Sequence, residues 1–449
     1  MAEKKYTKAS ARRAMMDMVM RFGKDGFCNP AASIGMASPL FSSGTFIRSN
    51  LTADKDLLTR AYRENWLAKR IIDTPAEDMT RAWYSLSTSS VSKEQLDALA
   101  QIEAQHSIKQ EITNAIRWAF LYGGSLALIC TLSHRIDKPL DMNIMFPGVF
   151  TGLLVIDQTM GVTPSTELVS DMFDPDYGLP EYYTMNIEGV GLQKIHHSRV
   201  LRFTGRELPC AEANRESFWG ASELEHVWDQ IITLNSVEAN IAELVFRANL
   251  TALKMNDIME MLSLGTDEKN EEVLRMLEMD NRLRTSYGIQ LLGENDTMET
   301  FNYNFAGLPE VFEQFMINVS GAAEIPATKL FGRSPQGMNA TGESDMQNYY
   351  ERIRSLQERM LRPALEKLLP VLLTQVGVDE KPADMKILFE PIRTMSLEER
   401  TKLAGDHTRF VMEAYEKGLI TREEAREELK KMSGRTDVWS ILNDGEEKK

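Results

Sequence analysis

The sequence predicts an α+β protein that is mainly helical, and two patterns support this fold class. Apolar residues recur at helical spacing over residues 51–120 and over most of the chain after residue 223. Between these regions, runs such as Phe150–Asp157 are short, rich in β-branched and aromatic residues, and separated by turn signals. The 449 residues allow two to four folding units, and the apolar fraction of 43% is ample for a buried core.

The charge balance and the cysteine count exclude several classes of protein. The chain has 51 Lys and Arg against 66 Asp and Glu, a formal net charge of −15. Because each phosphate contact needs a Lys or Arg, the chain is poorly suited to gripping a nucleic acid over a broad surface, although DNA can still pass close by. Cys28, Cys130 and Cys210 are far apart and form no CxxC pair. We therefore expect a reducing compartment, no disulfide framework and no cysteine-based zinc site.

No targeting or membrane-spanning segment is predicted. The N-terminus carries charges and methionines but lacks the apolar core of about 7–15 residues that a secretory signal needs. The longest apolar stretch, Trp118–Leu132, is interrupted by Gly123-Gly124 and is too short for a span of about 20 residues. We expect a protein that is soluble and intracellular when it is made.

Periodicity and capping signals place the helices of the first part of the chain. Residues 1–50 show little periodicity and are predicted to form a mobile arm. A helix is expected over Thr52–Asp73, with Thr52 or Asp54 as its N-cap and with Thr74-Pro75 as its end. A second helix, 93–120, is expected to begin at the capping box formed by Ser92 and Gln95.

The second part of the chain is predicted to be mainly helical. One long helix is expected to start near Leu224 and to continue through Val245, and another spans Pro309–Ala323. The second of these carries an apolar face made of Phe312, Phe315, Met316 and Val319. A helix from about Glu343 is expected to kink at Pro363. Two C-terminal helices begin at capping boxes, which are formed by Ser396 with Glu399 and by Thr421 with Glu424.

The signals for catalysis are weak. No HExxH, GxSxG or GxGxxG motif occurs, and the P-loop-like glycine spacing from Gly337 to Gly342 has Glu343 where the phosphate-binding Lys belongs. His196-His197 is the strongest candidate for a metal site or a general base. Adjacent residues of a strand point to opposite faces, so we expect one packed and one solvated ring that share no ligand sphere. From the sequence we expect a protein that is not an enzyme and that binds no cofactor and no metal.

One loop lies between two predicted helices and is rich in Gly, Pro, Ser and Asn. A loop of this length in helical surroundings is usually functional or disordered. Its only cation is Arg333, which makes the loop nearly uncharged. The alternative is a surface loop without a partner. Its residues are Arg333, Ser334, Pro335, Gln336, Gly337, Met338, Asn339, Ala340, Thr341 and Gly342.

Three segments, which fall within residues 50–375, resemble the portal proteins of tailed bacteriophages and prophages. The first segment, Tyr62–Thr80, resembles the opening helix of that family. The second, His197–Gly205 followed by Trp219–Ser222, resembles the strand and turn before the first stem helix. The third and most specific is Ile325–Gly337 with Asn339-Ala-Thr-Gly342-Glu, which resembles the loop after the inner helix.

The resemblance implies a portal fold with a wing, a two-helix stem, a clip, a tunnel loop and a helical crown, assembled as a ring of about twelve subunits. By position, it implies a mobile arm at 1–50, a wing at 51–220, an outer stem helix at 221–250, a clip at 251–305, an inner stem helix at 306–329, a tunnel loop at 330–342, a long helix completing the wing at 343–388, and a crown with a charged tail at 389–449.

The resemblance also implies a function, a location and partners. The ring would sit at one vertex of the capsid in the virion, after assembly in the host cytoplasm, and double-stranded DNA would be packaged and ejected through it. Its partners would be further copies of the chain, the terminase large subunit, the major capsid and scaffolding proteins, and a head–tail adaptor. The face of Phe312, Phe315, Met316 and Val319 would make subunit contacts, and no membrane would be involved.

The acidic composition agrees with such a role. A channel for moving DNA should not neutralise every phosphate, and Arg333 is a candidate for a single weak phosphate contact. Two alternatives stay open from the sequence. One is a phage minor head or adaptor protein without a channel, and the other is a phage-encoded hydrolase that uses His196 or His197.

Overall fold

The computed structural model places most of the chain in two compact units. Residues 229–319 form one unit, and 51–228 together with 320–436 form the other. The predicted arm at 1–50, most of the predicted clip, the loop at 333–341 and the charged tail lie outside the described residues. The structure describes residues 51–132, 135–187, 191–248, 251–254, 275, 297–300, 307–332, 342–378, 380–392 and 397–436.

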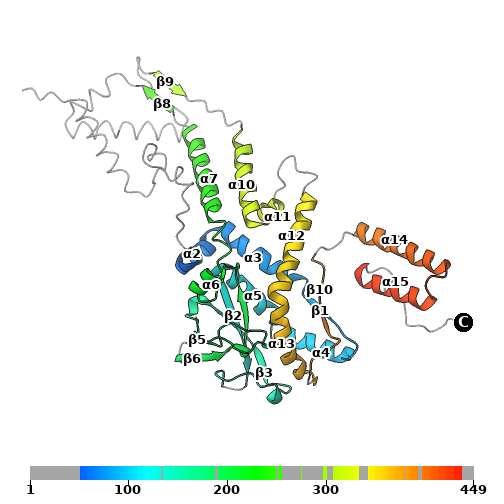
Figure 1. Cartoon of the computed structure of the whole chain (residues 1–449). Helices are drawn as coiled ribbons and strands as arrows, with labels where there is room; N and C mark the ends of the chain where they lie inside the picture. Colours follow the sequence, from blue (N-terminus) through cyan, green and yellow to red (C-terminus); the bar gives the residue numbers. More distant parts are fainter. Residues whose placement is uncertain are drawn as a thin grey trace, which may run out of the picture. The chain divides into compact units, whose positions relative to one another are not determined.

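A three-stranded antiparallel sheet is the centre of the larger unit (Figure 1). Strand β2 (Gly124–Thr131) lies between β3 (Phe150–Asp157) and β7 (Val200–Thr204), with Leu126 opposite Ile156 on one side. These strands match three predicted runs. A second antiparallel sheet has the order β4-β5-β6 and consists of Thr163–Pro164, Tyr182–Ile187 and Gly191–His196.

Side chains of the two sheets form one apolar core. Leu126, Leu128 and Ile156 from the first sheet meet Tyr183, Met185 and Ile195 from the second, and Val200 and Trp219 complete the cluster. Burying large apolar side chains of this kind contributes about 1.5–3 kcal/mol each, so the core holds the two sheets together.

Helix α5 (Ile108–Tyr122) packs on the first sheet, and its neighbour α3 (Trp66–Arg81) packs on α5. The predicted single helix over 93–120 is in fact two helices, α4 (Lys93–Gln105) and α5. They are separated at Ser107, whose left-handed φ of 51° is incompatible with a continuous helix. The capping box at Ser92 and Gln95 is confirmed, with both reciprocal hydrogen bonds present.

The predicted helix over Thr52–Asp73 also differs from the structure. A short 3-10 turn, η3 (Leu51–Ala53), precedes α2 (Lys55–Glu64), for which Asp54 is the N-cap. Asn65 then adopts an extended conformation and accepts the N–H groups of Leu67 and Ala68, so it ends α2 and begins α3.

Helix α3 (Trp66–Arg81) continues through Pro75, so the predicted end at Thr74-Pro75 is wrong. A proline inside a helix costs about 3 kcal/mol because it removes one hydrogen bond and crowds the preceding turn. The neighbouring Ile72, Ala76 and Met79 are fully buried. Their burial offsets the cost, and tertiary packing therefore overrides the local signal.

The remaining helices of the larger unit follow the last part of the chain. Helix α11 (Ala327–Phe331) is short, and α12 (Gly342–Leu356) continues through a π-helical turn at Gln357–Leu361 into α13 (Arg362–Gln375). The expected kink near Pro363 is thus preceded by a change of helix type, and Pro363 itself lies in the first turn of α13, where proline is tolerated. A small helix, α6 (Cys210–Arg215), follows β7.

Two further elements complete this unit. Strand β10 (Lys386–Phe389) pairs antiparallel with β1 (Tyr84–Ser87), which joins segments about three hundred residues apart. Helices α14 (Leu397–Glu416) and α15 (Arg422–Thr436) pack on each other. The capping box of Thr421 and Glu424 is confirmed, whereas Ser396 lies outside the described residues.

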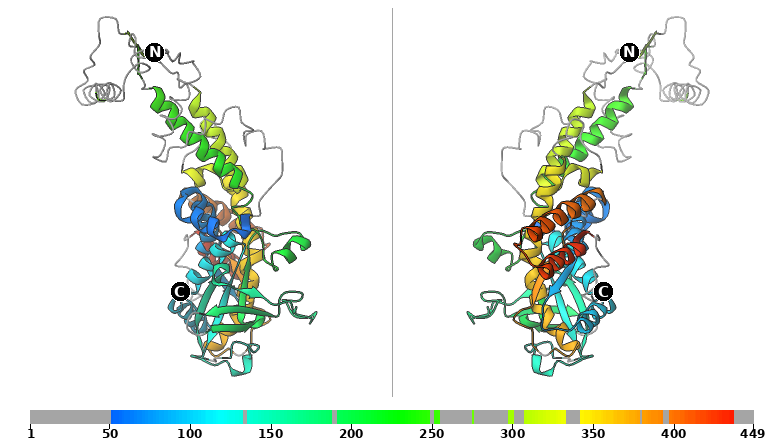
Figure 2. Two further views of the ribbon diagram at one scale, coloured as in Figure 1. Left: turned by 90° about the vertical axis from the view of Figure 1, so that its left-hand side faces the viewer. Right: turned by 90° about the vertical axis from the view of Figure 1, so that its right-hand side faces the viewer.

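Among its described residues, the smaller unit contains most of two helices and one antiparallel pair of strands. Helix α7 (Trp228–Ala248) begins four residues later than expected, and α10 (Leu308–Ala323), whose last four residues fall in the larger unit, matches the predicted helix closely. The two helices run side by side (Figures 1 and 2). Strands β8 (Thr251–Lys254) and β9 (Thr297–Thr300) form an antiparallel pair within the segment expected as the clip.

Three glycines, Gly123, Gly205 and Gly220, meet at the point where β2 begins and β7 ends. The carbonyl oxygen of Gly123 accepts the N–H groups of both Gly205 and Gly220 at 2.9 Å. A Cβ on Gly205 would lie 2.4 Å from the backbone oxygen of Ala221, which is closer than any real contact. The backbones can approach this closely only because these positions lack side chains.

We predict that Gly205→Ala lowers the free energy of unfolding by about 1–3 kcal/mol, because the backbone must shift to admit the methyl group. Gly321→Ala is the control, since no atom lies within 4 Å of a Cβ at that helical position. It should leave the stability unchanged or raise it by up to about 1 kcal/mol. Urea unfolding of both variants measures the difference, and equal midpoints would contradict the account.

Candidate functional site

The loop predicted at Arg333–Gly342 is bounded by two described helices. Arg333–Thr341 lie outside the described residues, and Gly342 is the first residue of α12. The helix before the loop, α11, ends at Gly332, whose φ of 71° is the left-handed conformation typical of a helix end. The structure therefore defines the two ends of the loop, and these ends form the candidate site.

Both ends are attached to α3 through one buried carboxylate. Asp78 is 4% exposed, and its Oδ2 atom accepts a 2.6 Å hydrogen bond from the hydroxyl of Tyr349 on α12. The ammonium of Lys329 on α11 lies 2.6 Å from the same oxygen and 5.1 Å from the Tyr349 ring. The other oxygen faces Arg81 at 3.4 Å.

This arrangement satisfies a charge that would otherwise be costly. A buried carboxylate is strongly unfavourable unless a cation and hydrogen-bond donors compensate it. Burial, together with the charge of Asp78 and the hydrogen bond to it, raises the pKa of Tyr349 well above its usual value. Tyr349 thus stays a neutral donor, and the segments before and after the loop are held to one point.

A second ionic cluster also joins the segments before and after the loop. Glu324, three residues before α11, faces Arg352 of α12, with Nε and Oε2 2.7 Å apart. Arg206 donates to the other oxygen of Glu324 at 3.0 Å and lies 2.7 Å from Nε2 of His226. Glu223 completes the cluster, 3.5 Å from Arg206 and 3.7 Å from Arg352.

The electrostatics of this cluster follow from its charges. Burial by itself raises the pKa of Glu324, but the guanidinium groups of Arg352 and Arg206 outweigh this effect and lower it. Burial lowers the pKa of His226, which therefore accepts a proton less readily. Two ionic clusters thus connect residues 324–329 to residues 349–352 on either side of the loop.

Apolar contacts strengthen the same two ends. Leu330 of α11 and Ile353 of α12 are fully buried. The ring of Phe331 stands edge-on to Trp66, with centroids 6.0 Å apart. Phe331, next to the start of the loop, is thus held by ring packing. This adds to the ionic contact of Lys329 in the same helix.

The predicted apolar face of α10 is placed as follows. Phe312, Phe315 and Met316 are half-buried, whereas Val319 is 1% exposed within a single chain. Val319 is therefore already covered within one chain, whereas the other three side chains keep accessible surface. Val311, on the same helix, is 51% exposed.

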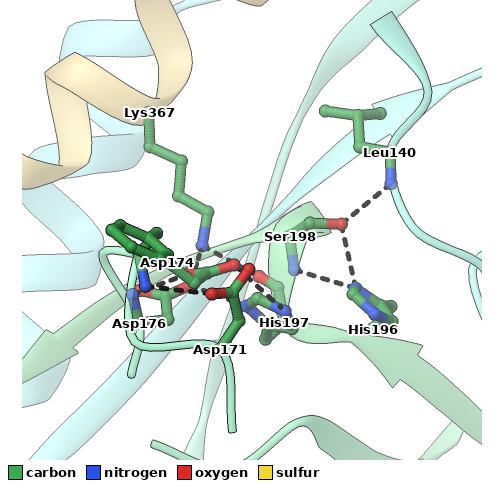
Figure 3. Close-up of polar contacts among 9 residues, drawn as sticks. Leu140, Asp171, Asp174, Asp176, His196, His197, Ser198 and Lys367 are labelled. Carbon is green, nitrogen blue, oxygen red and sulfur yellow. Dashed lines mark hydrogen bonds and ion pairs between the residues drawn. The ribbon is translucent and has the colours of Figure 1, made fainter. Parts of the chain in front are cut away.

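The two adjacent histidines do not behave as the strand pattern predicted. Both are 7% exposed, and their rings lie beside each other with centroids 4.5 Å apart (Figure 3). The prediction of one packed and one solvated ring is wrong because β6 ends at His196. His197 begins a 3-10 turn, which breaks the alternation of the strand.

His197 belongs to an ion-pair network. Its Nδ1 donates to Oδ2 of Asp176 at 2.9 Å, and the Lys367 ammonium lies 2.5 Å from the same oxygen. Burial by itself raises the pKa of Asp176, but His197 and Lys367 outweigh it and lower the pKa to about 2. Asp174 is 3.9 Å from Nε2 of His197, so the three residues have the composition of a metal site. The Lys367 ammonium already balances the charge of Asp176, so this carboxylate does not need a metal ion as its counter-charge.

His196 has a local structural role. Its Nδ1 accepts the backbone N–H of Ser198 at 3.2 Å, and the Ser198 hydroxyl is 2.9 Å away. The same hydroxyl accepts the N–H of Leu140 at 2.8 Å (Figure 3). Burial, with the neighbouring His197, lowers the pKa of His196. These contacts cap a turn, and the Ser–His contact is part of that cap.

The sequence analysis did not identify Asp78, Lys329 or Tyr349. One signal was present for Asp78, which is seven residues after the buried Ile71 and therefore lies on the apolar face of α3. A charge at such a position indicates a buried partner, but nothing in the sequence names a partner 271 residues away.

Among the described helices, none is both long and apolar enough to cross a lipid bilayer. Within the described residues Cys130 and Cys210 are free thiols.

The fold has relatives among solved structures. A chain in the neck of an empty GTA particle, computed with C6 symmetry, superposes with a TM-score of 0.54 at 14% identity, over 84% of this chain and 93% of the other. The chain therefore shares the fold of that neck chain. The family model for phage portal proteins matches residues 57–411, and the chain belongs to that family. It is a structural protein with a portal or connector role rather than an enzyme.

Sequence relatives are more varied in name. An uncharacterized protein of Haemophilus influenzae is 27% identical over 85% of this chain and 84% of its own length. The anti-CBASS protein Acb1 of a Caulobacter species is 29% identical over 78% of this chain. The match spans only 56% of that longer relative.

We predict that Asp78→Ala lowers the free energy of unfolding by about 3–5 kcal/mol, because it leaves the Lys329 ammonium without its partner. Tyr349→Phe should cost only about 1–2 kcal/mol, the value of one buried hydrogen bond. Glu77→Gln is the neighbouring control, because Glu77 is 61% exposed in its pair with Arg117 and should change stability by less than about 1 kcal/mol. Chemical denaturation ranks the three, and an Asp78→Ala midpoint equal to the control would refute the anchoring role.

Asp176 is expected to make the free energy of unfolding depend on pH in acid. The pKa of Asp176 is lower in the folded chain, at about 2, than the ordinary value of 3.8, so its contribution to stability is complete above about pH 4. That contribution, about 2 kcal/mol, is lost as the pH falls through about 2. Asp176→Asn should therefore flatten the acid part of the stability curve, as measured by urea unfolding from neutral pH down to acid. Parallel curves for the two proteins would show that Asp176 is not stabilised in this way.

Proposed function

We propose that the chain forms a ring of about twelve subunits at one vertex of a phage capsid, through which double-stranded DNA is packaged and ejected. In this proposal the terminase large subunit docks on the ring during packaging, and a head–tail adaptor replaces it later. Major capsid and scaffolding proteins surround the ring, which assembles in the host cytoplasm and remains in the virion. Membership of the phage portal family and the neck-like fold support this role.

The observation that carries the proposal is the double attachment of the loop ends. The segments that flank the loop are joined to each other through Asp78 and through the Glu324–Arg352 pair. A loop that meets moving DNA must take up force without detaching from its subunit, and ionic contacts on both sides provide that attachment.

The composition of the loop supports weak, sliding contact. Only Arg333 is positively charged among Arg333–Gly342, and the whole chain has a net charge of −15. Because affinity for DNA rises with each neutralised phosphate, a loop with one cation holds DNA loosely at every position. The glycines and Asn339 permit the varied backbone conformations needed where the symmetry of a ring and of a duplex differ.

The two long helices supply surface for subunit contacts. On α10, Phe312, Phe315 and Met316 are half-buried and Val311 is exposed. On α7, exposed apolar side chains occur at Ile232, Leu244 and Val245. Apolar residues on several sides of a helix require neighbours, and identical subunits in a closed ring provide them.

The parts of the chain are assigned accordingly. Helices α7 and α10 are the outer and inner stem helices, and β8 and β9 belong to the clip between them. The two sheets with α12 and α13 form the wing, and α14 with α15 form the crown.

The first test is the native mass of the purified chain. A ring of about twelve copies of the 51.0 kDa chain has a mass of about 600 kDa and shows a central hole by negative-stain microscopy. Replacing Arg333–Thr341 with a short Gly-Ser linker should leave this mass and the thermal midpoint unchanged, because both anchoring clusters remain. DNA packaging or retention in heads assembled with this variant should be lost.

The outcomes separate the alternatives. A chain that stays a monomer or dimer at all concentrations would favour a minor head or adaptor protein without a channel. Rings that package and retain DNA normally with the linker variant would show that the loop has no role at the DNA. Unfolding of that variant would show that the loop is structural.

A further inference from the structure

A loop of the wing exposes an unusual amount of apolar surface. We call residues 168–178 the acidic-aromatic loop. Within it Phe173 is 95% exposed, Met172 78% and Tyr177 55%. Single exposed apolar residues are common on proteins, but a group of them within one short loop marks an interaction site.

The loop is held rigidly despite its exposure. The oxygen Oδ1 of Asp171 accepts the N–H of Phe173 at 3.0 Å, and Oδ1 of Asp174 accepts the N–H of Asp176 at 2.8 Å. At the base of the loop, the N–H of Val169 donates to the Leu179 carbonyl at 2.8 Å. Side-chain-to-backbone bonds of this kind fix the turns on both sides of Phe173.

The rear of the loop is anchored to the buried network of the two histidines. The oxygen Oδ2 of Asp176 accepts a hydrogen bond from Nδ1 of His197 at 2.9 Å and lies 2.5 Å from Nζ of Lys367 on α13 (Figure 3). Lys367 also donates to the carbonyl oxygen of His197 at 3.0 Å. The contacts of Asp176 with His197 and Lys367 therefore hold the loop against α13 and against the turn after β6.

A rigid loop with an exposed aromatic tip is suited to docking. An ordered anchor loses little conformational entropy when it binds, and aromatic residues carry much of the energy at protein interfaces. From the exposed tip and its ordered base, we infer that the acidic-aromatic loop is a docking element whose Phe173 and Met172 enter an apolar pocket of another protein.

Charge selects the kind of partner. Asp171 is exposed and Asp174 is partly exposed, so the rim of the apolar tip is negative, while Asp176 is neutralised by Lys367. The matching surface is an apolar pocket bordered by Lys or Arg. DNA is disfavoured because its phosphates repel the carboxylates. A second copy is a separate outcome of the test below, because loss of a contact between copies would change ring formation rather than incorporation into shells.

This inference rests on the proposed function, which places the wing within a capsid. The partner we assign is the protein shell that surrounds the ring, and the probe is the major capsid protein of the same phage co-assembled with its scaffolding protein. Phe173→Ala should lower incorporation of the ring into shells, or its affinity for them, at least tenfold. The native mass and thermal midpoint should not change, because the side chain touches almost nothing in the chain.

Two further variants test the pocket and its charge. Asp171→Asn keeps an acceptor for the Phe173 N–H but removes the charge, so it should weaken incorporation and reduce its dependence on salt. Leu192→Ala is the control, since Leu192 is 74% exposed on β6 outside the loop and should have no effect.

Each result decides a separate question. If wild-type rings join the shells and Phe173→Ala rings join equally well, the docking role is wrong while the portal function stands. If Phe173→Ala instead abolishes the ring, the occupant is a second copy, and the assigned partner is wrong. Wild-type rings that never join a shell would overturn the inference and the proposed function together.

Discussion

The carboxylate of Asp78 is the constraint on which the arrangement of the larger unit depends. It is almost fully buried in the last turn of α3, where an uncompensated charge would cost several kcal/mol. Only the approach of α11 and α12 brings Lys329 and Tyr349 within hydrogen-bond distance of it. The position of these helices, and with it the position of Gly332 and Gly342 at the two ends of the loop, therefore follows from the need to satisfy one charge.

The same principle recurs at the turn that follows β6. Asp176 is held by His197 and Lys367, and this network stabilises a loop whose tip is apolar and exposed. In both places a partly or fully buried ionic cluster fixes the residues next to a segment that we propose makes contacts. Rigid support for the chain near such segments allows weak contacts at the surface without loss of the fold.

Local structure was largely predictable where periodicity and capping were strong. The strand Phe150–Asp157 and the helix ending at Ala323 agree with the predicted bounds, and two capping boxes formed as expected. The helix through Pro75 did not, because buried neighbours outweigh the local preference of proline. The end of α4 was also missed, since the left-handed Ser107 has no distinctive local signal.

The sequence by itself determined the α+β class, the main elements, the acidic charge and the resemblance to portal proteins. These features depend on residue types, periodicity and motifs that lie within one stretch of chain. Only the tertiary structure decided which side chains meet, including Asp78 with Tyr349 and the two histidine rings with each other. Such contacts join residues up to hundreds of positions apart, and burial gives them their energy. Their existence therefore depends on how the whole chain packs.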